Sequence, residues 1–196
     1  AYGYDRNNVF IYGVGGRLLF WGGDQWHYRE PNTIHDLFCM WGTDINNIHS
    51  VGGEGTYRFH DGKQFQRRDE LTSEEVSLYG VWGSASDDVY IVGSHGTILH
   101  FDGNEEGEWK PMVSGTDEYL LSVWGSCSND IFAVGDNATI LHYDGKSWSA
   151  MESKTDKYLT KIRGLRSDCV YAVGDDGLVI RFDGKKWNDM SLGEDA

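Results

Sequence analysis

This chain has little proline, little cysteine and a deficit of positive charge. Its 196 residues include 2 Pro and 3 Cys, and 17 Lys and Arg stand against 31 Asp and Glu, which gives a formal net charge of −14. The acidic balance argues against nucleic acid as a partner, because phosphate contacts need clustered Lys and Arg. No apolar run approaches the roughly 20 residues of a membrane helix, so we predict no membrane span.

The cysteines and the missing motifs also limit the chemistry. Cys39, Cys127 and Cys169 form an odd set without Cys-x-x-Cys spacing, which argues against a zinc cluster or a redox pair. One disulfide with a free thiol, or three buried reduced thiols, both fit the sequence. No Asp-x-Asp-x-Asp-Gly calcium loop occurs. The sequence therefore predicts no metal site and no cofactor.

Glycine, in contrast, is abundant, and its positions show an internal repeat. The chain has 26 Gly, nearly twice the average share of about 7%. One glycine, which follows a short β-type run, recurs about every 40 residues, a period typical of β-propeller blades. Its five copies are Gly13, Gly52, Gly93, Gly135 and Gly174.

Each repeat reads as four short strands, most clearly in the segments 81–103 and 123–145. The first strand ends at Trp-Gly, the second ends at the recurring glycine, and the third is a Thr-Ile-Leu-His-Phe type run. Asp-Gly follows it in four repeats, and this pair favours a type I′ hairpin turn because both central residues need positive φ. An aromatic residue then opens the fourth strand. Only a turn near 71–76 suggests a helix.

We therefore predict an all-β fold, a five-bladed β-propeller forming one domain over residues 1–196. The repeats run approximately over 1–37, 38–78, 79–120, 121–159 and 160–196. The first blade lacks most of its innermost strand. Closure of the ring without that strand, residues that precede Ala1, and oligomerisation into a larger ring are the three alternatives that this incomplete blade leaves open.

The Trp-Gly-Ser-x-Ser-x-Asp-Val-Tyr-x-Val-Gly phrase, followed by Asp-Gly-x-x-Trp, resembles the Kelch-like and WD-like propeller repeats of bacterial secreted and surface proteins. The resemblance covers essentially the whole chain and implies an extracellular or cell-surface location. The segments 144–148 and 183–187 also look like degenerate Asp-boxes, which are folding elements. The blade number is similar to that of tachylectin, whose inter-blade pockets hold amino sugars, but this likeness is an analogy of architecture alone.

Two groups of residues are candidates for ligand binding. The first is the aromatic column at the ends of the innermost strands, where flat rings would stack on sugars; packing between blades is the alternative and the more frequent role of such a column. The second lies on the face that carries the connections between blades, where loops on a rigid scaffold often bind ligands. The column contains Tyr2, Trp41, Trp82 and Trp124, and the second group contains His95, Tyr119 and Tyr158.

We expect a non-catalytic binding module, with carbohydrate as the first candidate ligand. A protein-interaction platform within a larger surface protein is the second hypothesis. A glycan-processing enzyme is the third, with His35 and Asp36 in the least regular stretch of the chain as its candidate catalytic residues. No Ser-His-Asp, Cys-His or His-Glu-x-x-His pattern supports the enzyme.

Overall fold

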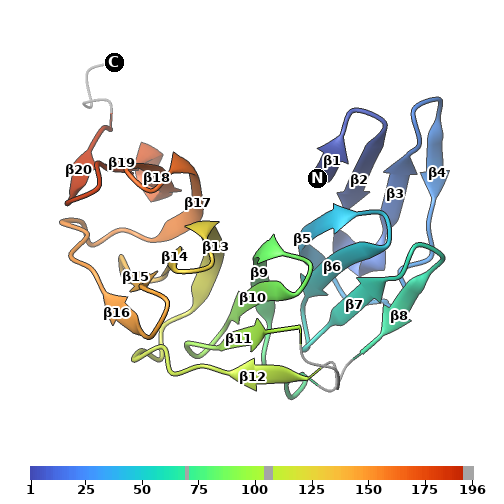
Figure 1. Ribbon diagram of the computed structural model, residues 1–196, viewed down its shortest axis with the longest axis horizontal. Coiled ribbons are helices and arrows are strands. Elements are labelled where there is room, and N and C mark those ends of the chain that lie inside the picture. Colours follow the sequence, from blue (N-terminus) through green and yellow to red (C-terminus); the bar gives the residue numbers. More distant parts are fainter. Residues whose placement is uncertain (69–70, 104–107, 192–196) are drawn as a thin grey trace.

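The computed structural model describes residues 1–68, 71–103 and 108–191. It is nearly all β, with five four-stranded antiparallel sheets that form the five blades (Figure 1). This confirms the predicted fold class and the blade count. In each blade the strands follow one another in chain order from the inside to the outside of the arc.

The strand bounds are as follows. Blade 1 contains β1 (Tyr2–Asp5), β2 (Asn8–Tyr12), β3 (Leu18–Trp21) and β4 (Trp26–Tyr28). Blade 2 contains β5 (Leu37–Asp44), β6 (Asn47–Gly52), β7 (Tyr57–His60) and β8 (Phe65–Arg67). Blade 3 contains β9 (Leu78–Ala85), β10 (Asp88–Gly93), β11 (Ile98–Phe101) and β12 (Trp109–Pro111). Blade 4 contains β13 (Leu120–Cys127), β14 (Asp130–Gly135), β15 (Ile140–Tyr143) and β16 (Trp148–Ala150). Blade 5 contains β17 (Leu159–Arg166), β18 (Cys169–Gly174), β19 (Val179–Phe182) and β20 (Trp187–Asp189).

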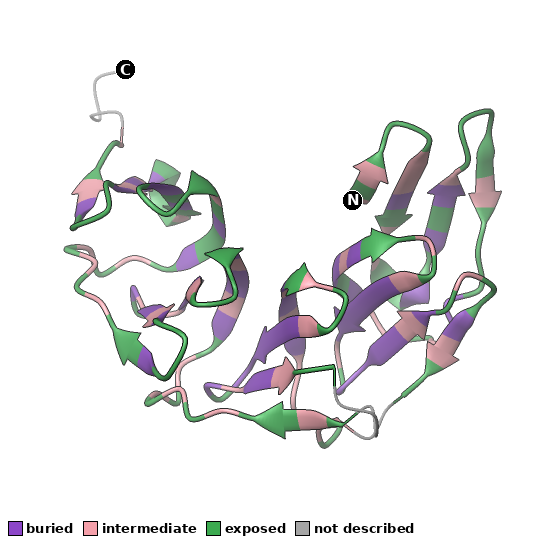
Figure 2. Ribbon diagram, viewed as in Figure 1, coloured by how far each residue is buried: buried purple, intermediate pink, exposed green. Residues whose placement is uncertain are grey.

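The innermost strands β1, β5, β9, β13 and β17 pack in that order along the inside of an arc. Figure 1 shows blades 1 and 5 at the two separate ends of this arc. β1 has 4 residues, whereas β5 has 8. The apolar core lies between neighbouring blades: Phe132 of blade 4, for example, is fully buried in a cluster with Ile162 and Ala172 of blade 5. The buried residues accordingly lie along the strands, and the exposed residues gather at the turns (Figure 2).

Some local predictions were wrong. The innermost strands do not end at Trp-Gly but continue for two residues beyond it, as in β5 and β13. Residues 71–76 form bends and a turn without a helix, and the two 3-10 turns are Val14–Gly16 and Asp175–Gly177. All three cysteines are free thiols, but Cys127 is exposed and only Cys39 and Cys169 are buried.

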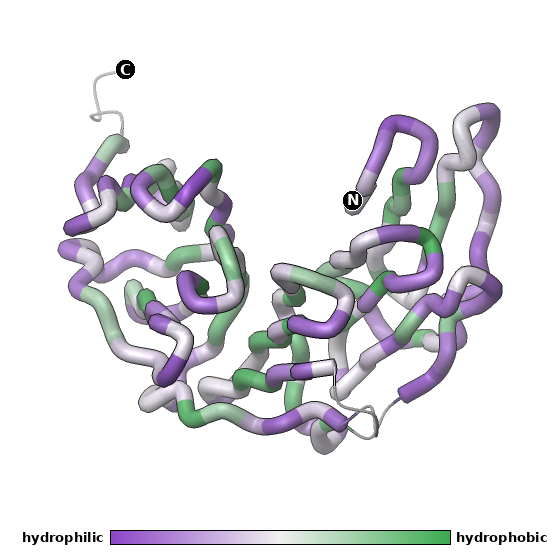
Figure 3. The backbone as a smooth tube through the Cα atoms, in the orientation of Figure 1, coloured by the Kyte–Doolittle hydropathy of each residue, from purple (hydrophilic) through white to green (hydrophobic). Residues whose placement is uncertain are grey.

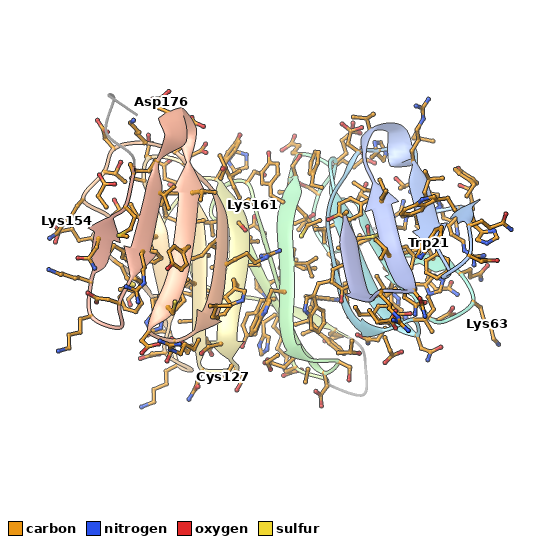
Figure 4. The ribbon with its side chains drawn as sticks, turned by 90° about the horizontal axis from the view of Figure 1, so that it is seen from above. Trp21, Lys63, Cys127, Lys154, Lys161 and Asp176 are labelled. Atoms are coloured by element: carbon orange, nitrogen blue, oxygen red, sulfur yellow. The ribbon has the colours of Figure 1, made fainter. Side chains whose placement is uncertain are left out.

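The molecule has two faces. The connection face carries the links between blades and the turns between second and third strands, such as the turn at Asp176. The hairpin face carries the opposite turns, which include Lys63 and Cys127. Figure 4 shows Asp176 at one edge of the strands and Lys63 and Cys127 at the other. Hydrophilic residues gather at the turns and hydrophobic ones along the strands (Figure 3).

On the connection face, each turn between second and third strands has two consecutive residues with positive φ. The second of the two is glycine in four blades, but in blade 4 it is Ala138, with φ 55°. A side chain in this left-handed region costs about 1–2 kcal/mol. The residues at this position are Gly16, Gly55, Gly96, Ala138 and Gly177.

We therefore expect Ala138→Gly to raise the free energy of unfolding by about 0.5–1 kcal/mol, once the greater freedom of glycine in the unfolded chain is subtracted. Urea denaturation measures the change. Gly177→Ala is the matched control, because a Cβ there has open space around it and only the backbone strain at φ 71° acts. It should destabilise by a similar amount. A lower unfolding midpoint for Ala138→Gly would contradict the argument.

On the hairpin face, the aspartate of the Asp-Gly turn holds the loop together. In blade 2, Asp61 Oδ1 accepts hydrogen bonds from the backbone N–H groups of Lys63 (3.0 Å) and Gln64 (3.1 Å), and Oδ2 accepts one from the Gln66 amide (3.0 Å). These bonds favour the charged carboxylate and lower the pKa of Asp61 to about 2, and similar bonds lower the pKa of Asp183 to about 2. Both turns are therefore tied by a charged side chain.

A pKa below the unfolded value of about 3.9 means that the stabilisation is fully present above about pH 4 and disappears as the pH falls through 2. Asp61→Asn should lower stability at pH 7 and flatten the pH dependence between pH 5 and 2. Urea midpoints across this range measure both effects. Parallel pH curves for Asp61→Asn and the wild type would show that this carboxylate does not contribute.

Candidate functional site: an aromatic ridge on the connection face

The aromatic column predicted from the sequence lies between blades. A Cβ built on Gly125 would lie 2.5 Å from Cη2 of Trp82, and Gly164 meets the ring of Trp124 in the same way. Each tryptophan therefore rests on a glycine of the next innermost strand. Trp41 repeats this contact with Gly83 of blade 3.

Tyr2 continues the column into blade 1, since its hydroxyl donates a hydrogen bond to the carbonyl oxygen of Gly42 in blade 2. The half-buried Trp41, Trp82 and Trp124 also pack against the buried clusters between blades. This geometry favours the packing role of the column. Sugar stacking on these rings stays a prediction.

A second set of aromatic rings lies on the connection face and is more exposed. Phe38, Tyr79, Tyr119 and His95 form a continuous row across blades 2, 3 and 4, which we call the aromatic ridge. The ring centroids of Phe38 and Tyr79 are 5.5 Å apart and those of Tyr79 and Tyr119 are 6.1 Å apart, both pairs stacked. His95 meets Tyr119 edge-on at 5.3 Å. Phe38 is 38% exposed and Tyr119 is 37% exposed.

The fold creates this ridge because the innermost strands start on the connection face. Phe38 and Tyr79 are the second residues of β5 and β9, and Tyr119 immediately precedes β13. His95 comes from the β10–β11 turn, where its own φ is 54°. This tight turn places the His95 imidazole next to the ring of Tyr119 at the start of blade 4.

Negative charge adjoins one end of the ridge. The backbone N–H of Asp136 donates a hydrogen bond to the carbonyl oxygen of Tyr119 at 2.9 Å, which places Asp136 beside Tyr119. Partial burial, together with the charges of Glu118 and Asp175, raises the pKa of Asp136. Burial makes the larger contribution to the raised pKa, and repulsion from the two neighbouring carboxylates adds to it. A cation bound here would relieve that repulsion.

The sequence located part of this site. His95 and Tyr119 were predicted and belong to the ridge, and Tyr158 takes the place of Tyr119 in blade 5, where it is 47% exposed. Phe38 and Tyr79 were missed. The available signal was an aromatic residue three positions before the Trp of Trp-Gly in two consecutive repeats.

The candidate catalytic pair has other contacts. The His35 imidazole pairs with Glu54 at 3.3 Å, while Asp36 Oδ1 accepts the Gly15 backbone N–H at 2.7 Å and so fastens a blade 1 turn to blade 2. The parts of the chain that the structure describes contain no group of three or more His, Cys, Asp or Glu able to hold a metal ion. Nor does any helix in those parts have the length and apolar character needed to cross a bilayer.

The outer side of the connection face is hollowed by similar clefts in blades 2, 3 and 4, with volumes of about 650, 600 and 700 Å³. In blades 3 and 4 the cleft wall has the same turn, in which Ser114 or Ser153 Oγ donates to the carbonyl oxygen two residues later at 3.1 Å. Blade 2 instead places Arg58 and Arg67 in its cleft.

Comparison with known proteins gives structural neighbours only. No family model matches the chain, and no curated protein matches it. YCF48 bound to a D1 peptide superposes with a TM-score of 0.72 at 16% identity, over 92% of this chain and 62% of that one. The RRP9 WD40 repeats give 0.75 at 8% identity, over 96% and 63%. An ancestral GH74 enzyme gives 0.71 at 13% identity, over 96% and 30%.

These likenesses show a β-propeller fold. The chain spans less than two thirds of the length of the YCF48 chain that it matches. At these low identities the neighbours do not indicate which partner this chain binds, so its own surface must provide the argument.

Proposed function

We propose that this protein is a non-catalytic protein-interaction module whose aromatic ridge binds a peptide segment that carries basic and apolar side chains. The single observation that carries the proposal is the ridge itself, a row of stacked rings across three blades. Aromatic residues supply most of the binding energy at protein interfaces. The peptide-bound YCF48 structure is a precedent for peptide binding by this fold.

Charge determines the chemistry of the partner. The carboxylates of Glu118, Asp136 and Asp175 interact beside Tyr119, and the whole chain carries a net charge of −14. A Lys or Arg side chain near these carboxylates and over the face of the Tyr119 ring would also gain a cation–π attraction. Binding should therefore weaken as salt screens the charges.

A peptide array on the intact protein tests the proposal, with basic amphipathic peptides beside matched peptides in which Glu replaces Lys and Arg. The basic set should bind, and Tyr79→Ala and Tyr119→Ala should each weaken binding about tenfold or more. Tyr28→Ala is the control, because Tyr28 is 61% exposed on the outermost strand of blade 1. Equal binding by all three variants would contradict a ridge site.

Carbohydrate binding is the second candidate, and the similar clefts of blades 3 and 4 favour it. Two equivalent weak sites on one arc would give avidity for a branched glycan. A glycan array on the same protein tests this, with about one site per cleft expected by titration. If no glycan binds and the basic peptides do, protein interaction remains as the single candidate function.

A further inference from the structure

The hairpin face differs at one blade junction. In blade 3, Ser84 Oγ donates to Asp88, and Asp88 Oδ1 binds His100 Nε2 at 2.7 Å. Blade 4 repeats this arrangement, with Asp130 Oδ1 at 2.8 Å from His142 Nε2. The serine bonds to aspartate rather than to histidine, so each group is a structural tie between strands.

Blade 2 lacks this tie because its residues differ. Alignment on the recurring glycine places Asn47 where blade 3 has Asp88, and Phe59 where it has His100. At the position of Tyr90, which stacks on His100 at 4.2 Å, blade 2 has His49. The repeat is therefore broken at three positions that face the junction with blade 3.

His49 is held in one protonation state by its neighbours. The indole N–H of Trp109, a donor only, bonds to the hydroxyl oxygen of Tyr57. The Tyr57 hydroxyl lies 2.9 Å from His49 Nδ1. We assign the hydroxyl proton to this contact, because Tyr57 is buried and a buried O–H group bonds to an acceptor within reach. On this assignment the proton of the neutral His49 ring lies on Nε2. Burial, with a smaller effect from Arg68, lowers the pKa of His49 to about 3, so the ring is neutral at physiological pH.

Two polar atoms at this junction have unused hydrogen-bonding capacity. His49 Nε2 and Asn47 Oδ1 are shielded from solvent and have no hydrogen-bond partner within residues 1–68, 71–103 and 108–191. A buried polar atom without a hydrogen bond is unfavourable, so a ligand that supplies the bond gains affinity. His49 and Asn47 are on the same side of β6, so a donor and an acceptor face the junction together.

Both residues line a cavity of about 330 Å³ between blades 2 and 3. Its walls are largely aromatic, and a guanidinium and a carboxylate of opposite charge line its exposed side. The lining includes Asn47, His49 and the rings of Tyr57, Phe59, Phe101 and Trp109. The exposed Arg68 and Asp87 side chains give the site no net charge.

We propose that this cavity binds an uncharged planar heterocycle with a ring carbonyl beside a ring N–H, the chemistry of uracil and 2-pyridone. The carbonyl accepts the bond from His49 Nε2–H, and the ring N–H donates to Asn47 Oδ1. The aromatic walls favour a flat ring. Because the two polar atoms are shielded, the ligand displaces neighbouring rings as it enters, and Trp109 reports this movement.

Ligand-observed NMR and tryptophan fluorescence on the intact protein test the site, with uracil and 2-pyridone as probes. We expect a Kd of about 1 mM for rings of this size. N-methyl-2-pyridone, which lacks the N–H, should bind at least about fivefold more weakly, since one hydrogen bond is lost. Absence of binding by both probes at 10-fold this concentration would overturn the proposal.

Two variants locate the site. His49→Phe copies Phe132 of blade 4 and should weaken uracil binding about tenfold or more. The double variant Asn47→Asp with Phe59→His rebuilds the tie of blades 3 and 4, so it should fold, raise the unfolding temperature and abolish binding. Unchanged uracil binding in either folded variant would overturn the site. Tyr79→Ala leaves uracil binding unchanged, which separates this cavity from the aromatic ridge.

Discussion

Gly135→Ala is expected to destabilise the protein by at least about 3 kcal/mol, a large share of the stability of a domain. Gly135 is the last residue of β14, where the second strand of blade 4 meets the start of β13. A Cβ there would lie 1.8 Å from the carbonyl oxygen of Tyr119 and 2.8 Å from its carbon. Both atoms are backbone, so they move only if the blade itself deforms.

The same position in blade 1 provides the control. A Cβ at Gly13 meets nothing within 4 Å, and its φ of 179° is extended backbone that alanine adopts readily. Gly13→Ala should therefore change stability by less than about 0.5 kcal/mol. Urea denaturation, followed by circular dichroism, compares the two variants. Equal shifts in their midpoints would refute the close-approach argument.

Trp82→Ala is expected to cost about 3 kcal/mol, because it removes a ring that packs on the cluster between blades 3 and 4 and leaves a cavity. The ring also lies on Gly125 and near Tyr90, with centroids 6.4 Å apart. Thermal unfolding measures the loss. Trp26→Ala, whose ring is 45% exposed, should cost less than about 1 kcal/mol.

A double variant separates packing from any other role of Trp82. Gly125→Ala alone drives a Cβ into the Trp82 ring at 2.5 Å. Removal of the ring in Trp82→Ala with Gly125→Ala relieves that clash, so the two effects should be non-additive by at least about 1 kcal/mol. Additive effects would show that the ring of Trp82 and Gly125 do not pack together. If Trp82→Ala remains as stable as the wild type but no longer binds glycans, the ring has the sugar-stacking role instead.

The repeat made most of the fold predictable. The spacing of Gly52, Gly93 and Gly135 and the Asp-Gly pairs predicted the blades, their strand order and the two faces, because each rests on local backbone preferences. The predicted type I′ geometry of the Asp-Gly turns was wrong, because only the glycine of each pair has positive φ. Strand ends were less accurate: β13 continues to Cys127 because its ladder with β14 extends beyond Trp-Gly. Pairing with the next strand, rather than the local sequence, decides where a strand stops.

The candidate sites show a similar division. The sequence identified His95 and Tyr119 as residues of one face, since strand alternation fixes the side of each loop. It gave no reason to join them with Phe38, because that contact depends on the angle between successive blades. The cavity at His49 likewise needs blade 3, which contributes Trp109.

The sequence by itself determined five four-stranded blades, the abundance of glycine at recurring turn and strand-end positions, and the rarity of proline in a chain of paired strands. Pro111, for example, lies in the outermost strand β12, where a missing N–H is tolerated. The tertiary structure decided that the tryptophan column packs on glycines, that four rings form an exposed ridge, and that blade 2 retains a polar cavity. These features depend on distances between blades, and no local pattern in one repeat encodes how closely the next repeat approaches it.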